Sequence, residues 1–305
     1  MTRKLQLKCA LAFLGICVFW GTSNLVTKIG VEGLPTPVFA CLRYLVAGLI
    51  FLIFSVLRKE HFPADPKTIG KLLMIGVIMH FGTNGCVVLS NKLIDSGVVT
   101  ILLATVPILA AVIQIFVFHT ERLSLYKFLG LVGGFAGIIF VASSGGGAQH
   151  VNGKGIMLGL FGALLWTVGS LFTSRLKLEG NLFSATSLQM LFVSGLFFIT
   201  GTISGSFLLP AFSWTLFWPV FYMALVDSTL GFLLYSWLLQ VWDPLKASTY
   251  AYINPVVALV LGALILHESI SVGKVAGMIL IIFSVVLIQK KNFKKVKFAE
   301  TNRTP

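Results

Sequence analysis

The chain has 305 residues, of which 57% are hydrophobic and only 11% are charged, and its mean hydropathy is +0.95. A soluble domain carries about 25% charged residues, so this composition excludes a water-soluble enzyme, a DNA-binding protein and a disordered scaffold. The net charge of +13 does not indicate a nucleic-acid partner, because the basic residues form short clusters between long apolar runs. The sequence predicts an all-α polytopic membrane protein.

Ten apolar runs follow one another along the chain, each near the roughly 20 residues that a helix needs to cross the hydrocarbon core. They cover approximately 8–29, 37–57, 70–91, 96–118, 124–143, 155–175, 182–205, 215–241, 244–266 and 272–290. The connections between them are short, so we expect no separate soluble domain. The first run is too long for a signal peptide and lacks a small-residue cleavage site.

The distribution of Lys and Arg predicts the orientation. With a cytoplasmic N-terminus, 18 of the 23 basic residues lie on the cytoplasmic side, four lie outside, and Arg43 falls within a span. This bias predicts a multi-pass protein of the cytoplasmic membrane with both termini inside the cell. The basic tail, 291–305, then lies where it can contact anionic membrane lipid.

An internal repeat relates the two halves of the chain. Trp20 and Trp166 are separated by 146 residues, and segments further along match at an offset of 148. The positions that match at 148 are Asp95 with Asp243, Pro107 with Pro255, and His119 with His267. We infer two five-helix repeats, 1–147 and 148–290, and because five is odd the second is inverted. Inverted repeats place a binding site near the bilayer midplane, which is typical of transporters. We expect its cavity between spans three and four of one half and spans eight and nine of the other.

Several motifs resemble those of the EamA-type transporters in the drug/metabolite transporter superfamily. They are Leu42-Arg43-Tyr44, Gly231-Phe-Leu-Leu-Tyr235-Ser-Trp-Leu-Leu, and Tyr252-Ile-Asn254-Pro255. The resemblance covers the whole chain and implies ten helices arranged as five plus five, with export of a small organic molecule as the usual activity. Asp227 departs from the family, whose members usually carry a small or apolar residue at this place in span eight.

Spans one, two and six contribute aromatic side chains and one charge. Trp20 with Asn24, like Trp166 with Ser170, forms a pair one helical turn apart. The tryptophans either pack against neighbouring helices or form an aromatic wall for an organic substrate. Arg43 lies near enough to the outer end of span two for its side chain to reach the headgroups. Because arginine is frequent here in the family, the resemblance favours a structural or gating role over direct contact with the substrate.

Span three carries His80, with Asn84 one turn later on the same face. An imidazole with its ordinary pKa near 6.5 is suited to proton exchange. The alternative is a histidine that only hydrogen-bonds between helices, and the sequence does not decide between the two.

Spans four and nine each contain a proline, Pro107 and Pro255. Proline removes a helical hydrogen bond and kinks the helix, and kinked helices often frame transporter sites. Tyr252 and Asn254 stand beside Pro255 and are candidates for lining a cavity. The alternative is that the prolines only kink their helices for the architecture of the bundle.

Span eight places Asp227 near the bilayer midplane, where an ionisable group costs roughly 2.5–3.5 kcal/mol on insertion scales. The carboxylate is a candidate for proton coupling or for binding a substrate amine, and the alternative is a hydrogen bond within the bundle. Tyr235 lies two turns later on the same face. Of the ionisable side chains, Asp227 and His80 are expected near the midplane, where they could meet across the pseudo-two-fold axis.

Spans five and ten contain G-x-x-x-G pairs, among them Gly133 with Gly137 and Gly273 with Gly277. Such pairs allow close helix packing, either within the chain or in a homodimer.

We therefore expect a secondary transporter that moves a small organic metabolite, amino acid or drug outward by alternating access, with no metal or other cofactor. Proton coupling is a hypothesis that rests on Asp227 and His80. The alternatives are a membrane-embedded enzyme and a channel. His267-Glu268 begins like a zinc-protease motif, but Ser271 stands where the second histidine is required. We find neither a nucleophile motif nor the charge ring of a channel.

Overall fold

The computed structural model describes residues 3–94, 96–120, 123–143, 152–176, 181–266 and 271–289. The expected repeat boundary at 147/148, the His267-Glu268 pair and the basic tail 291–305 lie outside these residues. Within them, every regular element is helical, and several helices follow one another without a loop.

The first half contains nine helical elements: α1 (Arg3–Gly33), α2 (Thr36–Leu57), α3 (Pro66–Gly76), η1 (Val77–Gly82), α4 (Thr83–Leu93), α5 (Ser96–Leu103), α6 (Val106–Val112), η2 (Ile113–Val117) and α7 (Leu125–Ser143). The second half contains α8 (Gly153–Arg175), α9 (Leu182–Ile203), α10 (Trp214–Tyr222), η3 (Met223–Gly231), α11 (Phe232–Val241), α12 (Pro244–Ser248), α13 (Tyr250–Leu266) and α14 (Val272–Gln289). The elements labelled η are π-helical.

Each of the ten apolar runs in the sequence coincides with one of these helices or with a series of them separated by at most two residues. Eight of the resulting segments are long and apolar enough to cross a membrane. The described parts of α7 and of α12–α13 do not meet that criterion of length, so the full count of ten spans remains a prediction. The fold is that of a multi-pass helical membrane protein.

Polar side chains start several of the helices. Asp65 accepts hydrogen bonds from the backbone amides of Lys67 and Thr68 at the start of α3. Asn152 and Asp243 cap α8 and α12 in the same way. These caps satisfy amides that have no partner within the helix, so each apolar segment begins at a defined residue.

Three of the described spans contain a π-helical turn, and two of these turns, η1 and η3, lie at corresponding places in the two halves. Thr83 directly follows η1 and Thr229 lies in η3; they are 146 residues apart, the same offset that separates Trp20 from Trp166. Each threonine hydroxyl donates to the carbonyl five residues earlier, Ile78 at 3.3 Å and Ala224 at 2.8 Å. These bonds match the wider turn of a π-helix, a feature found frequently at functional sites.

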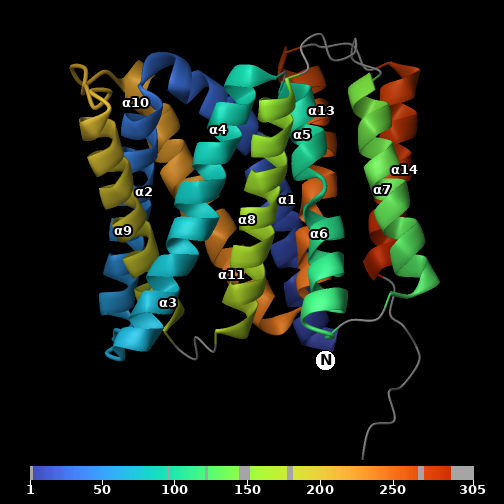
Figure 1. The fold of residues 1–305 in the computed structure, drawn as a ribbon, viewed down its shortest axis with the longest axis horizontal. Coiled ribbons are helices and arrows are strands. Elements are labelled where there is room, and N and C mark those ends of the chain that lie inside the picture. The colour runs from blue at the N-terminus through green and yellow to red at the C-terminus, as the bar shows by residue number, and fades with distance from the viewer. Residues whose placement is uncertain are drawn as a thin grey trace, which may run out of the picture.

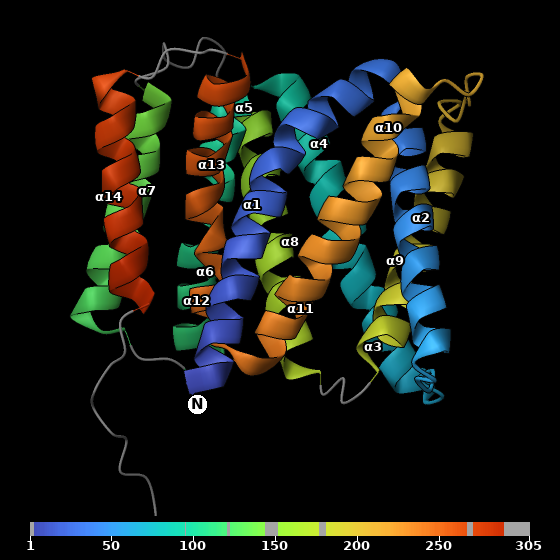
Figure 2. The ribbon, with the colours of Figure 1, turned by 180° about the vertical axis from the view of Figure 1, so that it is seen from behind.

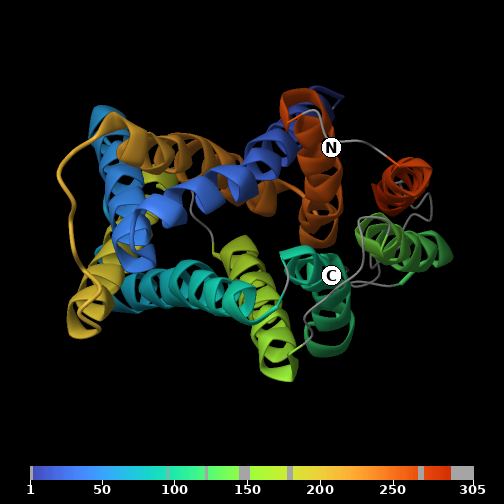
Figure 3. The same ribbon diagram turned by 90° about the horizontal axis from the view of Figure 1, so that it is seen from above.

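The helices stand side by side as a bundle (Figures 1 and 2). α1 rises from the end marked N, whereas α8 begins at the opposite end (Figure 1). Seen from above, α7 and α14 lie together at one side of the molecule (Figure 3). The contacts respect an exchange of the two halves: α4 packs on α8 as α11 packs on α1, and α2 packs on η3 as α9 packs on η1.

The glycines of spans five and ten pack α7 on α14 within the same chain. A Cβ on Gly137 would stand 3.1 Å from the carbonyl oxygen of Gly277, and one on Gly277 would stand 2.9 Å from that of Gly137. Only glycine permits so close an approach of the two backbones. The G-x-x-x-G pairs therefore serve packing within the chain, and a homodimer remains a prediction.

Candidate functional site

An ion pair inside the bundle joins the two halves of the chain. Arg43 of α2 places Nη2 2.5 Å from Oδ2 of Asp227 in η3. Its Nε donates to the hydroxyl of Ser228 at 2.7 Å. The two charged side chains are only 12% and 13% exposed, so the pairing offsets the cost of placing each charge away from water.

This pair corrects two expectations from the sequence. Arg43 does not extend toward the outer headgroups, because its guanidinium turns inward to a carboxylate and a hydroxyl. His80 and Asp227 do not form a pair, because Asp227 bonds to Arg43. Arg43 thus joins His80 and Asp227 as an ionisable side chain of the interior.

Four aromatic side chains pack beside the ion pair. Trp20 contacts Trp166, Tyr235 and Tyr250, with ring centroids 5.4, 5.1 and 4.6 Å apart. Its Nε1 donates to the backbone oxygen of Asp227 at 3.2 Å. The hydroxyl of Tyr235 donates to Ser170 at 3.0 Å. These four rings, which we call the aromatic cluster, combine side chains from spans one, six, eight and nine.

Gly231 makes room for the cluster. A Cβ at this position would stand 2.5 Å from Nε1 and 3.0 Å from Cδ1 of Trp20. The space beside the backbone of Gly231 is therefore filled by the indole of Trp20.

His80 lies against Trp166 of the aromatic cluster. It is 3% exposed, and its ring contacts Tyr44, Phe232 and Trp166 at centroid distances of 5.4, 4.5 and 6.3 Å. Among the residues that the structure describes, no group hydrogen-bonds to its Nε2. Because buried polar atoms are normally hydrogen-bonded, this nitrogen is a candidate contact for a ligand.

Asn84 links His80 to Arg43 through Tyr44. Its side-chain amide donates to the hydroxyl of Tyr44 and to the backbone oxygen of His80, both at 2.7 Å. The guanidinium of Arg43 lies 4.9 Å from the centre of the Tyr44 ring, which is within the range of a cation–π interaction. The predicted residues His80, Asn84 and Arg43 therefore form one connected group with Asp227.

The two prolines occupy different places in their helical segments, and Tyr252, near Pro255, bonds to another helix. The chain leaves the helical form at Ala104 and Thr105, directly before Pro107, whereas Pro255 lies inside α13. Tyr252 is fully buried and donates to the backbone oxygen of Leu131 in α7 at 3.1 Å. Tyr252 therefore connects α13 to α7.

Two further candidates remain less defined. Asn254 keeps a buried Oδ1 that has no hydrogen-bond partner among the described residues. The side chain of Asn24 lies outside the described residues.

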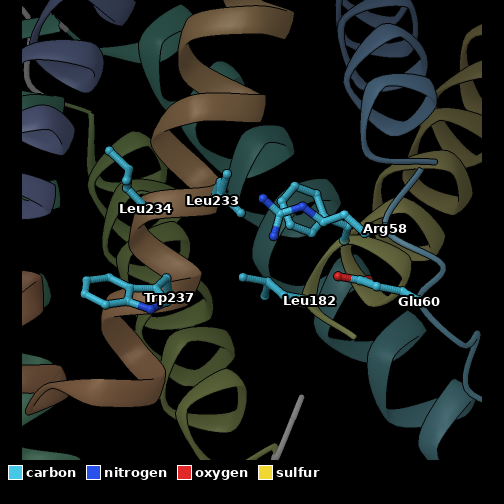
Figure 4. Close-up of a pocket in the computed structure, with 7 residues that line it drawn as sticks. Arg58, Glu60, Leu182, Leu233, Leu234 and Trp237 are labelled. Atoms are coloured by element: carbon cyan, nitrogen blue, oxygen red, sulfur yellow. The ribbon is translucent and has the colours of Figure 1, made fainter. Parts of the chain in front are cut away.

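A pocket of about 370 Å³ lies at the end of the molecule where α1 begins. It is lined from the end of α2 and the following loop, the start of α9, and α11 (Figure 4). The lining residues are Arg58, Glu60, Leu182, Phe183, Leu233, Leu234 and Trp237. The sequence predicted a cavity lined by spans three, four, eight and nine. This pocket is instead lined by residues of spans two, seven and eight.

The prediction from sequence missed Tyr44, Ser228 and Tyr250. Tyr44 belongs to the Leu42-Arg43-Tyr44 motif, and Ser228 directly follows Asp227, so their neighbours gave a signal. Tyr250 stands at the start of α13, two residues before Tyr252. The choice between these two tyrosines depends on helix rotation, which spacing alone does not give.

The comparisons with known proteins agree with this architecture. The model of the EamA-like transporter family matches twice, over residues 7–143 and 153–289. The chain is 31% identical to the inner membrane transporter YedA of Escherichia coli K12, over 91% of this chain and 89% of that protein. It is 26% identical to a probable amino-acid metabolite efflux pump of Salmonella typhimurium, over 87% of this chain and 89% of that protein.

A solved crystal structure has the same fold, with a TM-score of 0.80 at 16% identity, over 92% of this chain and 96% of that one. The two family matches together cover nearly all of the chain. The chain therefore belongs to the EamA-like transporter family of the drug/metabolite transporter superfamily.

Proposed function

We propose that this chain is a secondary transporter that exports a small organic metabolite, with amino acids and their relatives as the first substrates to test. The observation that carries the proposal is the buried Arg43–Asp227 ion pair between the two halves, placed against the aromatic cluster. The family and the efflux pump from Salmonella support transport rather than an enzymatic reaction. The pump's name also supports the outward direction and the substrate class.

Alternating access requires the two halves to move relative to each other around a central site. Arg43 lies in the first half and Asp227 in the second, so separating α2 from η3 must break their bond. A buried charge that loses its partner costs several kcal/mol. The halves therefore separate here only when another group replaces the lost interaction.

A proton is one such group. Binding of a proton from outside to the Asp227 carboxylate removes its negative charge, so the halves can separate as they return inward without substrate. Release of that proton into the cytoplasm recharges Asp227, and the charged groups of the substrate then replace the ion pair on the outward step, so that substrate and proton move in opposite directions. Each cycle moves one proton and one substrate molecule, and no covalent bond of the substrate changes.

The aromatic cluster and His80 supply the remaining contacts. Trp20, Trp166, Tyr235 and Tyr250 offer ring faces for an apolar or aromatic body. His80 offers Nε2, which has no hydrogen-bond partner among the described residues, for a polar group. Because Trp20 also bonds to the backbone of Asp227, a substrate that displaces its ring would also affect the ion pair.

Transport measurements in proteoliposomes test the proposal. Radiolabelled amino acids and related metabolites are supplied with and without a pH gradient, and empty liposomes serve as the control. The proposal expects saturable movement of at least one compound, recovered unchanged, that is faster with the gradient. A chemically altered product would instead indicate an enzyme, and flux that does not saturate would indicate a channel.

A further inference from the structure

The pocket between α2, α9 and α11 is built from an apolar wall and two charged side chains. The apolar lining comes from Leu233, Leu234 and Trp237 of α11 and from Leu182 and Phe183 at the start of α9; Figure 4 shows the leucines and Trp237. Arg58 extends from the end of α2 toward Leu233, and Glu60 lies beside Leu182 (Figure 4). Both charged side chains thus border the same apolar space.

The two charges have different surroundings. The Glu60 carboxylate accepts a hydrogen bond from the backbone amide of Ser184 at 2.8 Å, in the first turn of α9, where a negative charge is favourable. Arg58 stacks on Phe183, with its Cζ 4.7 Å from the ring centre. Among the described residues, no carboxylate forms an ion pair with Arg58. Within the described part of the chain, the five N–H donors of the guanidinium thus meet no carboxylate and can bind an anion from solution.

From this arrangement we infer that the pocket binds a small organic carboxylate with an apolar or aromatic body. The carboxylate would pair with Arg58, for which the planar fork of a guanidinium is well matched. The apolar body would lie against Trp237 and the leucines. The volume of about 370 Å³ falls within the usual range for small-molecule sites. We expect a two-chain phospholipid to be too large for it.

The position of the pocket suits a site of first contact for cargo. Leu233 follows Asp227 by six residues, which is less than two helical turns along the same span. The predicted topology places the end of α2 on the cytoplasmic side, from which an exporter takes its substrate. The role as an entry site rests on the proposed function, whereas binding to the pocket does not require transport.

The test measures binding of indole-3-propionate to the purified full-length protein in detergent, by isothermal titration calorimetry. Tryptamine has the same ring with a positive charge and serves as the probe for charge selectivity. We expect the acid to bind about tenfold more tightly than the amine, and the Arg58→Gln variant to lose about tenfold in affinity for the acid. Lys59→Gln is the matched control, because Lys59 is the next residue, is exposed and does not line the pocket.

Further arms keep the result interpretable. Trp237→Leu should weaken binding of the acid, and Arg58→Lys should weaken it less than Arg58→Gln does, which gives a second readout if Arg58→Gln does not fold. Equal affinities in Arg58→Gln and Lys59→Gln, or equal affinities for acid and amine, would overturn the proposal. So would displacement of the acid by an equal concentration of phosphatidylglycerol, which would assign the pocket to lipid. Failure of transport with binding intact would count against the proposed function alone.

Discussion

Arg43 and Asp227 make each other's burial tolerable. Removing each charge from water costs free energy, and the attraction between the two charges at their short contact offsets part of that cost. Ser228 satisfies one more donor of the guanidinium. The energy of this pair therefore depends on both partners being present.

A double-mutant cycle tests that dependence. Arg43→Gln or Asp227→Asn alone leaves one buried charge unpaired, and each should destabilise the protein by about 3–5 kcal/mol. The double variant removes both charges and should be less destabilised than the sum of the single variants, with a coupling energy of about 1–3 kcal/mol. Thermal unfolding in detergent measures all four proteins. Additive effects would show that the pair contributes nothing as a pair.

Gly231 is the point at which the aromatic cluster is most sensitive to added volume. In Gly231→Ala the new Cβ would collide with Trp20, so the indole must shift and its bond to Asp227 must lengthen. We expect a loss of about 1–3 kcal/mol in stability and at least a severalfold loss of transport rate.

The matched control for this prediction is Gly85→Ala, because a Cβ on Gly85 meets no atom within 4 Å. Alanine favours a helix over glycine by about 1 kcal/mol, so this variant should be as stable as the natural protein and as active. Equal losses in the two variants would indicate a general effect of alanine rather than the contact with Trp20.

At the scale of elements, the π-helical turns η1 and η3 set the positions of His80 and Asp227. Thr229 supports η3 through its bond to the Ala224 oxygen at 2.8 Å. Thr229→Val keeps the shape of the side chain and removes this bond. Because η3 holds Asp227, we expect a lower initial transport rate with little change in expression.

Thr200→Val provides the comparison, since the Thr200 hydroxyl makes an ordinary bond to the carbonyl four residues earlier in α9. Its transport rate should match that of the natural protein when both are measured in parallel. If both valine variants transport at the natural rate, η3 does not depend on the hydroxyl of Thr229.

The same elements show what sequence reasoning reached. The spans were predictable because each apolar run has the length of a membrane helix, and the match with α2, at 37–57 against Thr36–Leu57, is typical. The π-turns were not predictable, because a single extra residue in a turn leaves the apolar pattern intact. That extra residue rotates the helix beyond it, and rotation decides which side chains face each other. The sequence identified Trp20, Trp166 and Tyr235 as candidates from their places along the spans. It did not identify Arg43 as the partner of Asp227, because that contact depends on helix rotation.

At the scale of the whole molecule, the contacts follow a two-fold exchange of the halves, and the positive charges favour one orientation. Reporter fusions at His150 and Arg303 test that orientation, although both residues lie outside the described part of the chain. Alkaline phosphatase, which is active only outside the cytoplasm, should be active at His150 and inactive at Arg303. Activity at Arg303 would place the C-terminus outside and would reverse the assignment of the Arg58 pocket to the cytoplasmic side.

The central claim is that opening of the two halves is coupled to the charge of Asp227. The most direct test compares the natural protein with Asp227→Asn in proteoliposomes, measuring transport driven by a pH gradient and exchange of substrate at equal pH. Asparagine keeps the size and hydrogen-bonding capacity of the side chain but cannot carry the proton. We predict that transport driven by the gradient is abolished and that exchange at equal pH is largely retained in the folded fraction. A pH dependence equal to that of the natural protein would contradict the claim.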